Sequence, residues 1–311
     1  MAAMVEITNL TKQYRTLSAV WNLSLTLDEG DIFGFIGPNG AGKTTTIKML
    51  ATLLRPTTGT ARIDGHDIVT ASDRVRSVVG YMPDSFGVYE DIRVWEYLDF
   101  FAAAYRIPRS QRPQTIDGVL ALTDLQGKRH AYVDELSRGM KQRLCLAKTL
   151  VHDPKVLLLD EPASGLDPRA RIEIRELLKE LQSMGKTIFI SSHILAELAD
   201  FCNKVGIIEN GQLIVAGDVH EIIERIKGHL QVCIEVQDGV ERATQVLAQL
   251  PGVGGIEVEN HEIKAEFNGT RDGLPGLLKA LIEAGIPIRA FGEEEIDLED
   301  VFIRLTRGIV S

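Results

Sequence analysis

Long hydrophobic runs are missing from this sequence, and their absence argues against a membrane-spanning helix. Such a helix needs roughly 20 consecutive apolar residues. Although 44% of the 311 residues are apolar, the stretch from Leu146 to Leu159 is interrupted by Lys148, His152, Asp153 and Lys155. The first residues also lack the basic and apolar regions of an export signal. We therefore expect a cytoplasmic protein that does not span a membrane.

Cysteine is scarce, which excludes two common ways of stabilising a fold. The sequence has only Cys145, Cys202 and Cys233, which are far apart and show no Cys-x-x-Cys spacing. An odd number without that spacing implies neither a disulfide framework nor a zinc site. We expect reduced and mostly buried cysteines.

Positive charge is also in short supply. The formal net charge is −10. Residues 221–311 hold nine Lys and Arg against seventeen Asp and Glu, which gives this segment a charge of −8. Residues 1–220 therefore carry the remaining −2. Nucleic-acid-binding domains usually carry a basic patch. The charge therefore predicts no nucleic-acid partner.

A glycine-rich loop is the first motif that carries chemistry. A short apolar strand, Ile32 to Ile36, leads into the loop Gly37-Pro38-Asn39-Gly40-Ala41-Gly42-Lys43-Thr44, followed by Thr45. The loop matches G-x-x-x-x-G-K-[ST], in which backbone N–H groups and the lysine bind phosphates and the hydroxyl ligates Mg²⁺. A chance glycine turn is the alternative, but the preceding strand and following helix favour a nucleotide site for ATP and Mg²⁺.

Two carboxylates end a second apolar strand. Asp160 and Glu161 follow Val156 to Leu159, and strand ends of this kind present ligand-facing side chains in α/β sheets. One carboxylate can hold magnesium while its neighbour accepts a proton from water. A buried strand followed by a helix cap is the alternative, which the upstream phosphate loop disfavours.

The segment Leu136 to Arg143, Leu-Ser-Arg-Gly-Met-Lys-Gln-Arg, lies just before that strand. Ser137 precedes a helical stretch, so it can cap a helix whose free N–H groups bind anions. Ordinary helix capping is the alternative. Its position thirteen residues before Val156 favours a second anion-binding motif.

The order of elements predicts an α/β fold: a P-loop NTPase cassette over residues 1–218. Alternating Leu23, Leu25 and Leu27 predict an antiparallel β subdomain. Apolar spacings of three and four predict an inserted helical subdomain over about 86–152. Strands at 156–160, 187–191 and 204–209, a helix over Pro168 to Met184 and another opening near His193 predict a mostly parallel sheet.

A small α+β domain follows the cassette. We expect a linker helix over 219–228 and an accessory C-terminal domain over 229–311. Its predicted elements are a strand at 230–236, a helix at about 240–249, strands around Ile256 and Ile263, a helix through Leu274 to Leu281, a strand from Ile286 to Phe291, and a terminal helix with Leu298, Val301, Phe302 and Leu305. The order β-α-β-β-α-β is ferredoxin-like.

Taken together, these motifs resemble the ATP-binding subunit of an ATP-binding cassette (ABC) transporter over roughly residues 4 to 217. The resemblance implies an ATPase in which Lys43, Glu161 and His193 act in catalysis. It implies that Tyr14 stacks on adenine beside the phosphate loop, although a tyrosine at a strand edge is equally compatible. A lone histidine is usually structural, but the spacing of His193 from Glu161 favours the functional reading.

The resemblance also implies that two subunits share each nucleotide. Ser137 and Gly139 match the signature motif, which in this family contacts the γ-phosphate held by the other subunit. The segment Ser164 to Asp167 matches the loop that passes between subunits. We therefore expect a homodimer with two ATP sites.

The sequence departs from the family pattern at three positions. Asp84 stands where the family usually has glutamine, and it joins Thr44 and Asp160 as an expected Mg²⁺ ligand. Arg138 and Met140 replace the commoner glycine and glutamine of the signature. The signature serine and second glycine are retained, so we expect ATP to be bound between subunits.

The accessory domain, with its ending Leu298-Glu-Asp-Val-Phe302, resembles that of the type-two exporter group, which handles drugs, antibiotics, sodium or polysaccharides. We expect a separate membrane permease, attachment through it to the inner face of the membrane, and a permease groove that includes Phe86 and Tyr89. An importer subunit is the alternative. A non-transport ABC ATPase acting on DNA or ribosomes is disfavoured by the single cassette and the negative charge.

Overall fold

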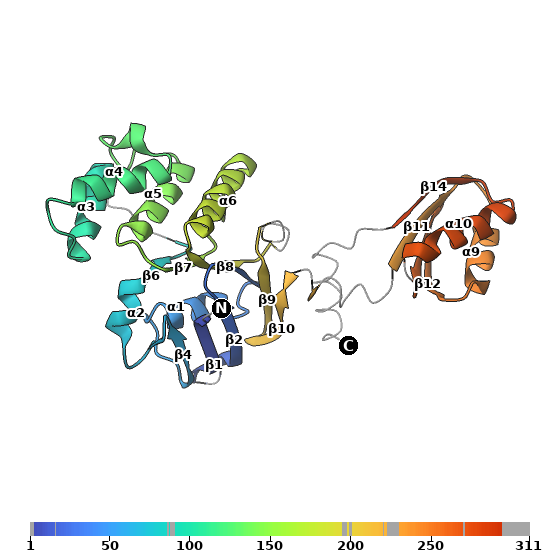
Figure 1. Ribbon diagram of the computed structural model, residues 1–311, viewed down its shortest axis with the longest axis horizontal. Coiled ribbons are helices and arrows are strands. Elements are labelled where there is room, and N and C mark those ends of the chain that lie inside the picture. The colour runs from blue at the N-terminus through green and yellow to red at the C-terminus, as the bar shows by residue number, and fades with distance from the viewer. Residues whose placement is uncertain are drawn as a thin grey trace. The chain divides into compact units, whose positions relative to one another are not determined.

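The structure is a computed structural model. It describes residues 3–15, 17–85, 87, 91–194, 198, 201–219, 221–222, 230–269 and 271–293. The chain divides into two compact units, Met1–Val219 and His220–Ser311, and Figure 1 shows the elements of each in chain order.

The first unit contains two sheets and several helices. Its elements are β1 Ala3–Tyr14, β2 Leu17–Asp28, β3 Ile32–Ile36, α1 Lys43–Leu50, β4 Thr58–Ile63, β5 His66–Asp67, α2 Ser72–Val78, β6 Val79–Met82, α3 Val94–Ala104, α4 Arg112–Leu122, η1 Gln126–Lys128, α5 Arg138–Leu150, β7 Val156–Asp160, α6 Pro168–Ser183, β8 Thr187–Ser192, β9 Lys204–Glu209 and β10 Gln212–Asp218.

A six-stranded sheet with the order β10-β9-β3-β8-β7-β6 forms the centre of this unit. Its strands are parallel except for the edge strand β10. Every residue of β3, β7 and β8 is buried, as expected of parallel strands covered on both faces. The rings of Phe33 and Phe35 each lie 5.2 Å from the ring of Phe189. The predicted, mostly parallel sheet is confirmed.

The second sheet is antiparallel, with the order β2-β1-β4-β5. In β2, Leu23, Leu25 and Leu27 are buried and alternate with exposed residues, which confirms the predicted antiparallel β subdomain. These leucines share one hydrophobic cluster with Ile47 of α1 and Phe35 of β3. The two sheets are therefore joined through α1, the helix that follows the phosphate loop.

The helices α3, α4 and α5 gather on one side of the central sheet (Figure 1, green). They are tied to each other and to α6 by ion pairs: Arg112 contacts Asp99, and Arg143 contacts both Asp124 and Glu173. The predicted inserted helices are confirmed. Strand β6 ends at Met82, because Pro83 has no N–H to continue the strand pairing.

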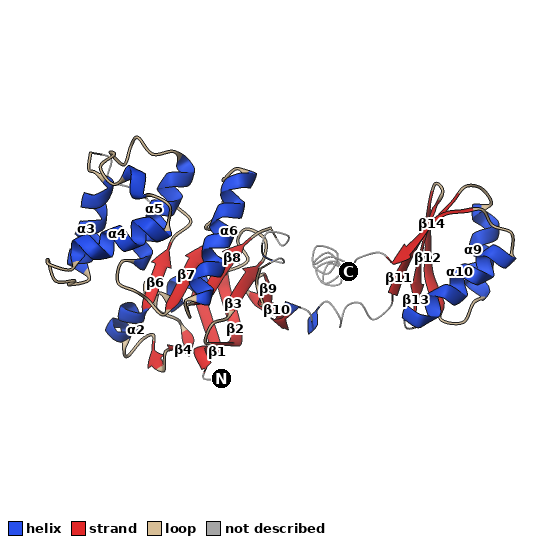
Figure 2. Cartoon of the chain, turned by 45° about the horizontal axis from the view of Figure 1, so that its top comes forward, coloured by secondary structure: helices blue, strands red, loops and turns tan. Residues whose placement is uncertain are grey.

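The second unit has a four-stranded antiparallel sheet with the order β12-β13-β11-β14. Figure 2 shows its two helices on one face of this sheet. Along the chain, its strands and helices follow the predicted ferredoxin-like order β-α-β-β-α-β. The elements are β11 Leu230–Val236, α9 Val240–Gln249, β12 Val253–Glu259, β13 Glu262–Phe267, η2 Arg271–Gly273, α10 Leu274–Glu283 and β14 Ile288–Glu293.

One predicted strand of this unit starts later than expected. Ile286 is buried, but its N–H donates to Leu281 O at the end of α10 (3.1 Å), and Pro287 follows. β14 therefore begins at Ile288. Most of the predicted linker helix over 219–228 and the predicted terminal helix with Leu298 to Leu305 lie outside the described residues.

Two further observations bear on the expectations from composition. Cys145 and Cys202 are buried and Cys233 is partly buried, which confirms the expected burial of most of the cysteines. Within the part of the chain that the structure describes, no helix is both long and apolar enough to cross a membrane.

Candidate active site

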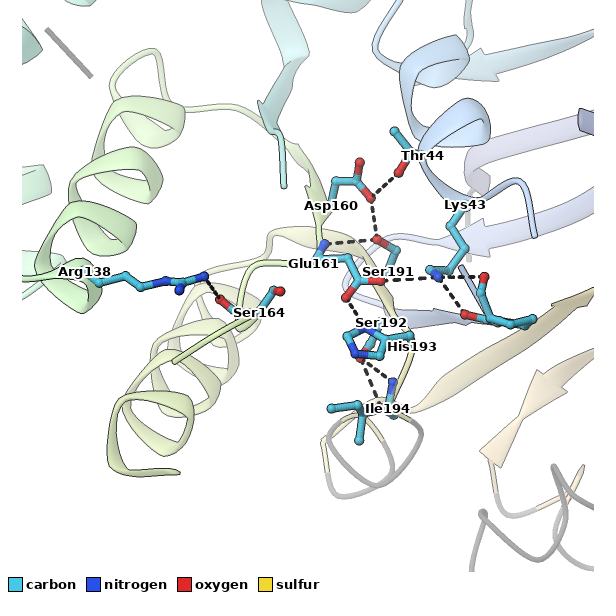
Figure 3. A network of polar contacts seen from close by, with 12 residues as sticks. Lys43, Thr44, Arg138, Asp160, Glu161, Ser164, Ser191, Ser192, His193 and Ile194 are labelled. Carbon is cyan, nitrogen blue, oxygen red and sulfur yellow. Dashed lines mark hydrogen bonds and ion pairs between the residues drawn. The ribbon is translucent and has the colours of Figure 1, made fainter. Parts of the chain in front are cut away.

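Three neighbouring parallel strands deliver the predicted catalytic residues to one edge of the central sheet (Figure 3). β3 leads into the loop Gly37 to Thr44, β7 ends at Asp160, and β8 ends at Ser192. Because β3 pairs with β8 and β8 with β7 in parallel register, their carboxyl ends lie side by side. Ligands bind at this edge in α/β sheets.

The phosphate loop is held in shape by its own lysine. Gly42 has φ of 110° and forms the N-cap of α1, a conformation that favours glycine. A Cβ at this position would also lie only 2.4 Å from Ala19 O. Lys43 Nζ donates to Gly37 O at 2.6 Å and to Pro38 O at 3.2 Å. The lysine charge is therefore fixed within the loop.

Asp160 is almost completely buried, with 1% of its surface exposed. Its Oδ1 accepts hydrogen bonds from Ser191 Oγ at 2.8 Å and from Thr44 Oγ1 at 3.2 Å. Burial raises the pKa of Asp160, the two hydrogen bonds lower it, and the nearby charges of Asp84 and Glu161 raise it further. A carboxylate in these surroundings is stabilised by a cation.

Glu161 occupies a strained position at the end of β7. Its φ is 51°, in the left-handed region that residues other than glycine seldom adopt and that is enriched at functional sites. Its N–H donates to Ser191 Oγ at 3.1 Å. Lys43 Nζ lies 3.3 Å from its Oε1, and His193 Nδ1 lies 2.6 Å from its Oε2. The carboxylate is thus held between a lysine and a histidine.

Lys43, Glu161 and His193 line a pocket of about 440 Å³, whereas Asp160 is not among its lining residues. The pocket brings together seven of the ten residues expected to bind ATP and adds six others. The lining residues are Tyr14, Leu17, Ala19, Asn39, Gly40, Gly42, Lys43, Thr44, Thr45, Asp84, Glu161, Ser164 and His193.

Three expected nucleotide-site residues contribute from behind this lining. The carbonyls of Gly37 and Pro38 hold Lys43, as described above. Ala41 is buried, its N–H donates to Pro38 O at 3.1 Å, and its carbonyl accepts from Gly211 N at 2.9 Å. These residues therefore fix the loop on which the lining residues sit.

The signature residues and Asp167 lie on two helix N-termini outside the lining of this pocket. Ser137 caps α5 by accepting from Met140 N at 3.3 Å, and Asp167 caps α6 by accepting from Ala170 N at 3.0 Å. A Cβ at Gly139 would lie 3.7 Å from that of Ala170, so the two termini are adjacent. Phe86 and Tyr89 lie outside the described residues.

The sequence reasoning missed two residues that organise the site. Ser191 joins the Asp160 carboxylate to the backbone N–H of Glu161. Only its place at the end of a buried strand, two residues before His193, could have drawn attention to it. Gln142 is buried on α5, and its Nε2 donates to Pro162 O, next to Glu161, at 2.6 Å. No local pattern marks that contact, because the two residues meet only in the folded chain.

The oxygen donors at this edge suit magnesium. The Thr44 hydroxyl and the Asp160 carboxylate are 3.2 Å apart, and Asp84 lines the same pocket. Within the described ranges, no group of three or more His, Cys, Asp or Glu could hold a metal. Mg²⁺ usually takes one or two protein oxygens together with phosphate oxygens and water, so the residues present fit that ion.

Comparisons with known proteins agree with the fold. The pattern described as "ABC transporter" matches residues 20–164, and the pattern described as "ATP-binding protein DrrA1-3-like, C-terminal domain" matches residues 217–306. The Nod factor export ATP-binding protein I of Cupriavidus metallidurans is 36% identical over 98% of this chain and 98% of its own. The bacitracin transport ATP-binding protein of Bacillus licheniformis is 34% identical over 99% of each chain.

A solved structure gives the same result. The dimeric, post-hydrolysis structure of the ATP-binding cassette MJ0796, bound to ADP and phosphate, matches with a TM-score of 0.63 and 25% identity. The match covers 70% of this chain and 99% of that one. The chain therefore belongs to the ATP-binding subunits of ABC transporters, whose activity is ATP hydrolysis, and within them to the exporter group with a DrrA-like C-terminal domain.

Proposed function

We propose that this chain hydrolyses ATP, as a homodimer, to power export of a substrate through a separate membrane permease. The export direction is supported by relatives named for Nod factor export and bacitracin transport, which align over almost the whole chain. It is also supported by the DrrA-like C-terminal domain. The observation that carries the hydrolytic role is the Glu161 carboxylate, held between Lys43 and His193 in the pocket.

The residues of the pocket divide the chemistry between them. Lys43 neutralises the β- and γ-phosphates, because its charge is fixed within the loop whose N–H groups bind phosphate. Glu161 orients the attacking water and accepts its proton. His193 holds the Glu161 carboxylate and contacts the γ-phosphate. Their mutual contacts place all three before any substrate enters, which lowers the cost of reorganisation.

Mg²⁺ would be held by Thr44 and Asp160, with Asp84 nearby. When bound, the ion would neutralise phosphate charge. Ser191 keeps Asp160 oriented through the 2.8 Å hydrogen bond. Tyr14 also lines the pocket and offers an adenine platform. The residue is 44% exposed, and Lys12 Nζ lies 5.1 Å from the centre of its ring.

The signature acts on the partner subunit's nucleotide. Ser137 and Gly139 begin α5, and helix N-termini bind anions. They do not line the pocket of their own chain. Two-fold symmetry then gives two sites, each completed by the other chain, with Asp167 near the boundary. The net charge of −10 supports a protein partner rather than nucleic acid.

We propose that the permease contacts a groove of about 230 Å³ between the central sheet and the inserted helices. Leu53 and Tyr105 at its rim are 61% and 41% exposed. The Tyr81 hydroxyl, buried there without a hydrogen-bond partner, adds a polar group. The lining is Ala51, Leu53, Arg76, Val79, Tyr81, Phe101, Tyr105, Lys148 and Thr149. Binding there would hold this subunit on the inner face of the membrane.

Replacement of Glu161 by Gln tests the hydrolytic role. The amide keeps the shape of the side chain but cannot accept the proton, so we expect hydrolysis to fall at least about 100-fold while ATP binding persists. The variant should form an ATP-dependent dimer in size-exclusion chromatography. Glu176→Gln, at a 63% exposed position on α6, is the control. Normal hydrolysis by Glu161→Gln would refute the proposal.

The direction of transport needs a separate test. The full-length protein is purified from detergent-solubilised membranes and its bound proteins are identified. A permease without a solute-binding protein supports export. A solute-binding protein in the same complex would contradict it.

A further inference from the structure

The signature helix is fastened to the loop that follows Glu161. Arg138 and Gln142 lie one turn apart on α5, so their side chains share a face of the helix. Arg138 Nη2 donates to Ser164 O at 3.2 Å, and Gln142 Nε2 donates to Pro162 O at 2.6 Å. Figure 3 shows Arg138 reaching from α5 to Ser164. One helix face thus binds two carbonyls of a single loop.

Gly165 makes this contact close. Its φ of 66° lies in the left-handed region, and a Cβ there would come within 2.0 Å of Arg138 Nη2 and 2.4 Å of its Cζ. The guanidinium therefore lies directly against the Gly165 α-carbon. Any larger residue at this position would displace the Arg138 side chain, so the two residues are matched.

The charge of Arg138 is poorly suited to its place in α5. Arg138 is the first residue of the helix, and the partial positive charge of a helix N-terminus disfavours a cation there. The adjacent N-terminus of α6, which begins at Pro168, adds a second partial positive charge. The Ser164 carbonyl offsets this unfavourable position, so the observed conformation depends on the loop contact.

We propose that Arg138 is a positioning residue for ATP hydrolysis across the dimer. It fixes the loop Pro162 to Gly165 against the N-terminus of α5. The signature residue Ser137 and the inter-subunit loop through Asp167 then form one rigid surface that closes on the partner's nucleotide. The proposal rests on the homodimer proposed above.

Arg138→Gly removes the contact and restores the residue usual in the family. In a Glu161→Gln background, we expect the ATP concentration needed for half-maximal dimerisation to rise about five- to tenfold, as for the net loss of one exposed hydrogen bond. With Glu161 intact, kcat should fall by a similar factor. Thermal stability and binding of a fluorescent ATP analogue to single subunits should stay unchanged. Arg138→Lys, whose ammonium group is still a charged donor, should recover part of the lost dimerisation and kcat.

Two variants make the test specific. Arg109→Gly, in the exposed loop between α3 and α4, is the control and should behave as the unmodified protein. Gly165→Ala should also impair dimerisation, because its Cβ displaces the guanidinium. In an Arg138→Gly background that steric part of its effect should disappear, so the two changes should be less than additive.

Several results would overturn the proposal. Unchanged dimerisation and kcat in Arg138→Gly would show that the contact has no role. Two results together would indicate that Arg138 contacts the partner's nucleotide directly. The effects of Arg138→Gly and Gly165→Ala would be additive, and kcat would fall by more than about 1,000-fold, the size expected for an arginine that stabilises transferring phosphate. If unmodified chains lack ATPase activity and Glu161→Gln chains never dimerise with ATP, the proposed function itself fails.

Discussion

Ser191 offers the sharpest test of how Asp160 and Glu161 are held. Its Oγ is buried, donates to Asp160 Oδ1 at 2.8 Å and accepts from Glu161 N at 3.1 Å. Ser191→Ala removes this oxygen without adding volume. The Asp160 carboxylate and the Glu161 N–H then each lose a partner. Only Thr44 still donates to Asp160.

The magnitude follows from these contacts. Leaving one buried polar group unsatisfied costs about 1–3 kcal/mol. The Glu161 N–H loses its partner, whereas Asp160 keeps the hydrogen bond from Thr44, so the range is about 1–3 kcal/mol. An adjoining cavity of about 30 Å³, lined by Ser191, Glu161 and others, has room for a water that would replace part of the loss. We therefore expect a decrease of about 2 kcal/mol in the free energy of unfolding, or about 4–8 °C in Tm.

The assay is urea unfolding followed by tryptophan fluorescence. The only two tryptophans, Trp21 and Trp95, lie in the first unit, so the signal reports that unit alone. Ser24→Ala is the matched control, because Ser24 Oγ also makes two hydrogen bonds, with Asn9, but on the surface. A Ser191→Ala effect no larger than that of the control would refute the assigned role.

Two further predictions concern the surface of the first unit. Burial would raise the pKa of Asp67, but hydrogen bonds led by those from Thr60 and Thr70 outweigh it and lower the pKa to about 2. A carboxyl group whose pKa is lower in the folded state stabilises the fold at pH values above its unfolded-state pKa, and this stabilisation is lost as the pH falls toward 2. Asp67→Asn should therefore lower the free energy of unfolding by about 1 kcal/mol at pH 7. The difference, measured in denaturant titrations, should shrink progressively between pH 4 and pH 2. Leu53→Glu should abolish co-purification of the permease without changing ATPase activity, whereas Met184→Glu, at a 56% exposed position, should not; permease retained by Leu53→Glu would contradict the groove assignment.

The phosphate loop and the carboxylate pair could be predicted because each is encoded locally. Gly42 and Lys43 act within a few residues of each other, and Asp160 and Glu161 are adjacent in sequence. The strand before each motif is uniformly apolar, since it is buried on both faces of the sheet. Motif, strand and position at the sheet edge therefore follow from one short stretch of sequence.

The edges of the sheets were harder to predict from sequence. β1 pairs with β2 through several register shifts, which break the simple alternation of apolar and polar residues. β10 is an edge strand whose residues are mostly partly buried, so its pattern lacks contrast. Both elements are specified by partners elsewhere in the chain.

The loop after Glu161 links the two halves of the proposed reaction within one chain. Ser191 fixes the backbone of Glu161 from the β8 side, while Gln142 and Arg138 fix the following carbonyls from α5. Glu161 needs such support because its φ of 51° is unfavourable for a glutamate. A shift of α5 must therefore either break these hydrogen bonds or move the backbone next to the catalytic carboxylate. The N-terminus of α5, which we propose serves the partner's nucleotide, is in this way mechanically connected to Glu161, which we propose serves the nucleotide of its own subunit.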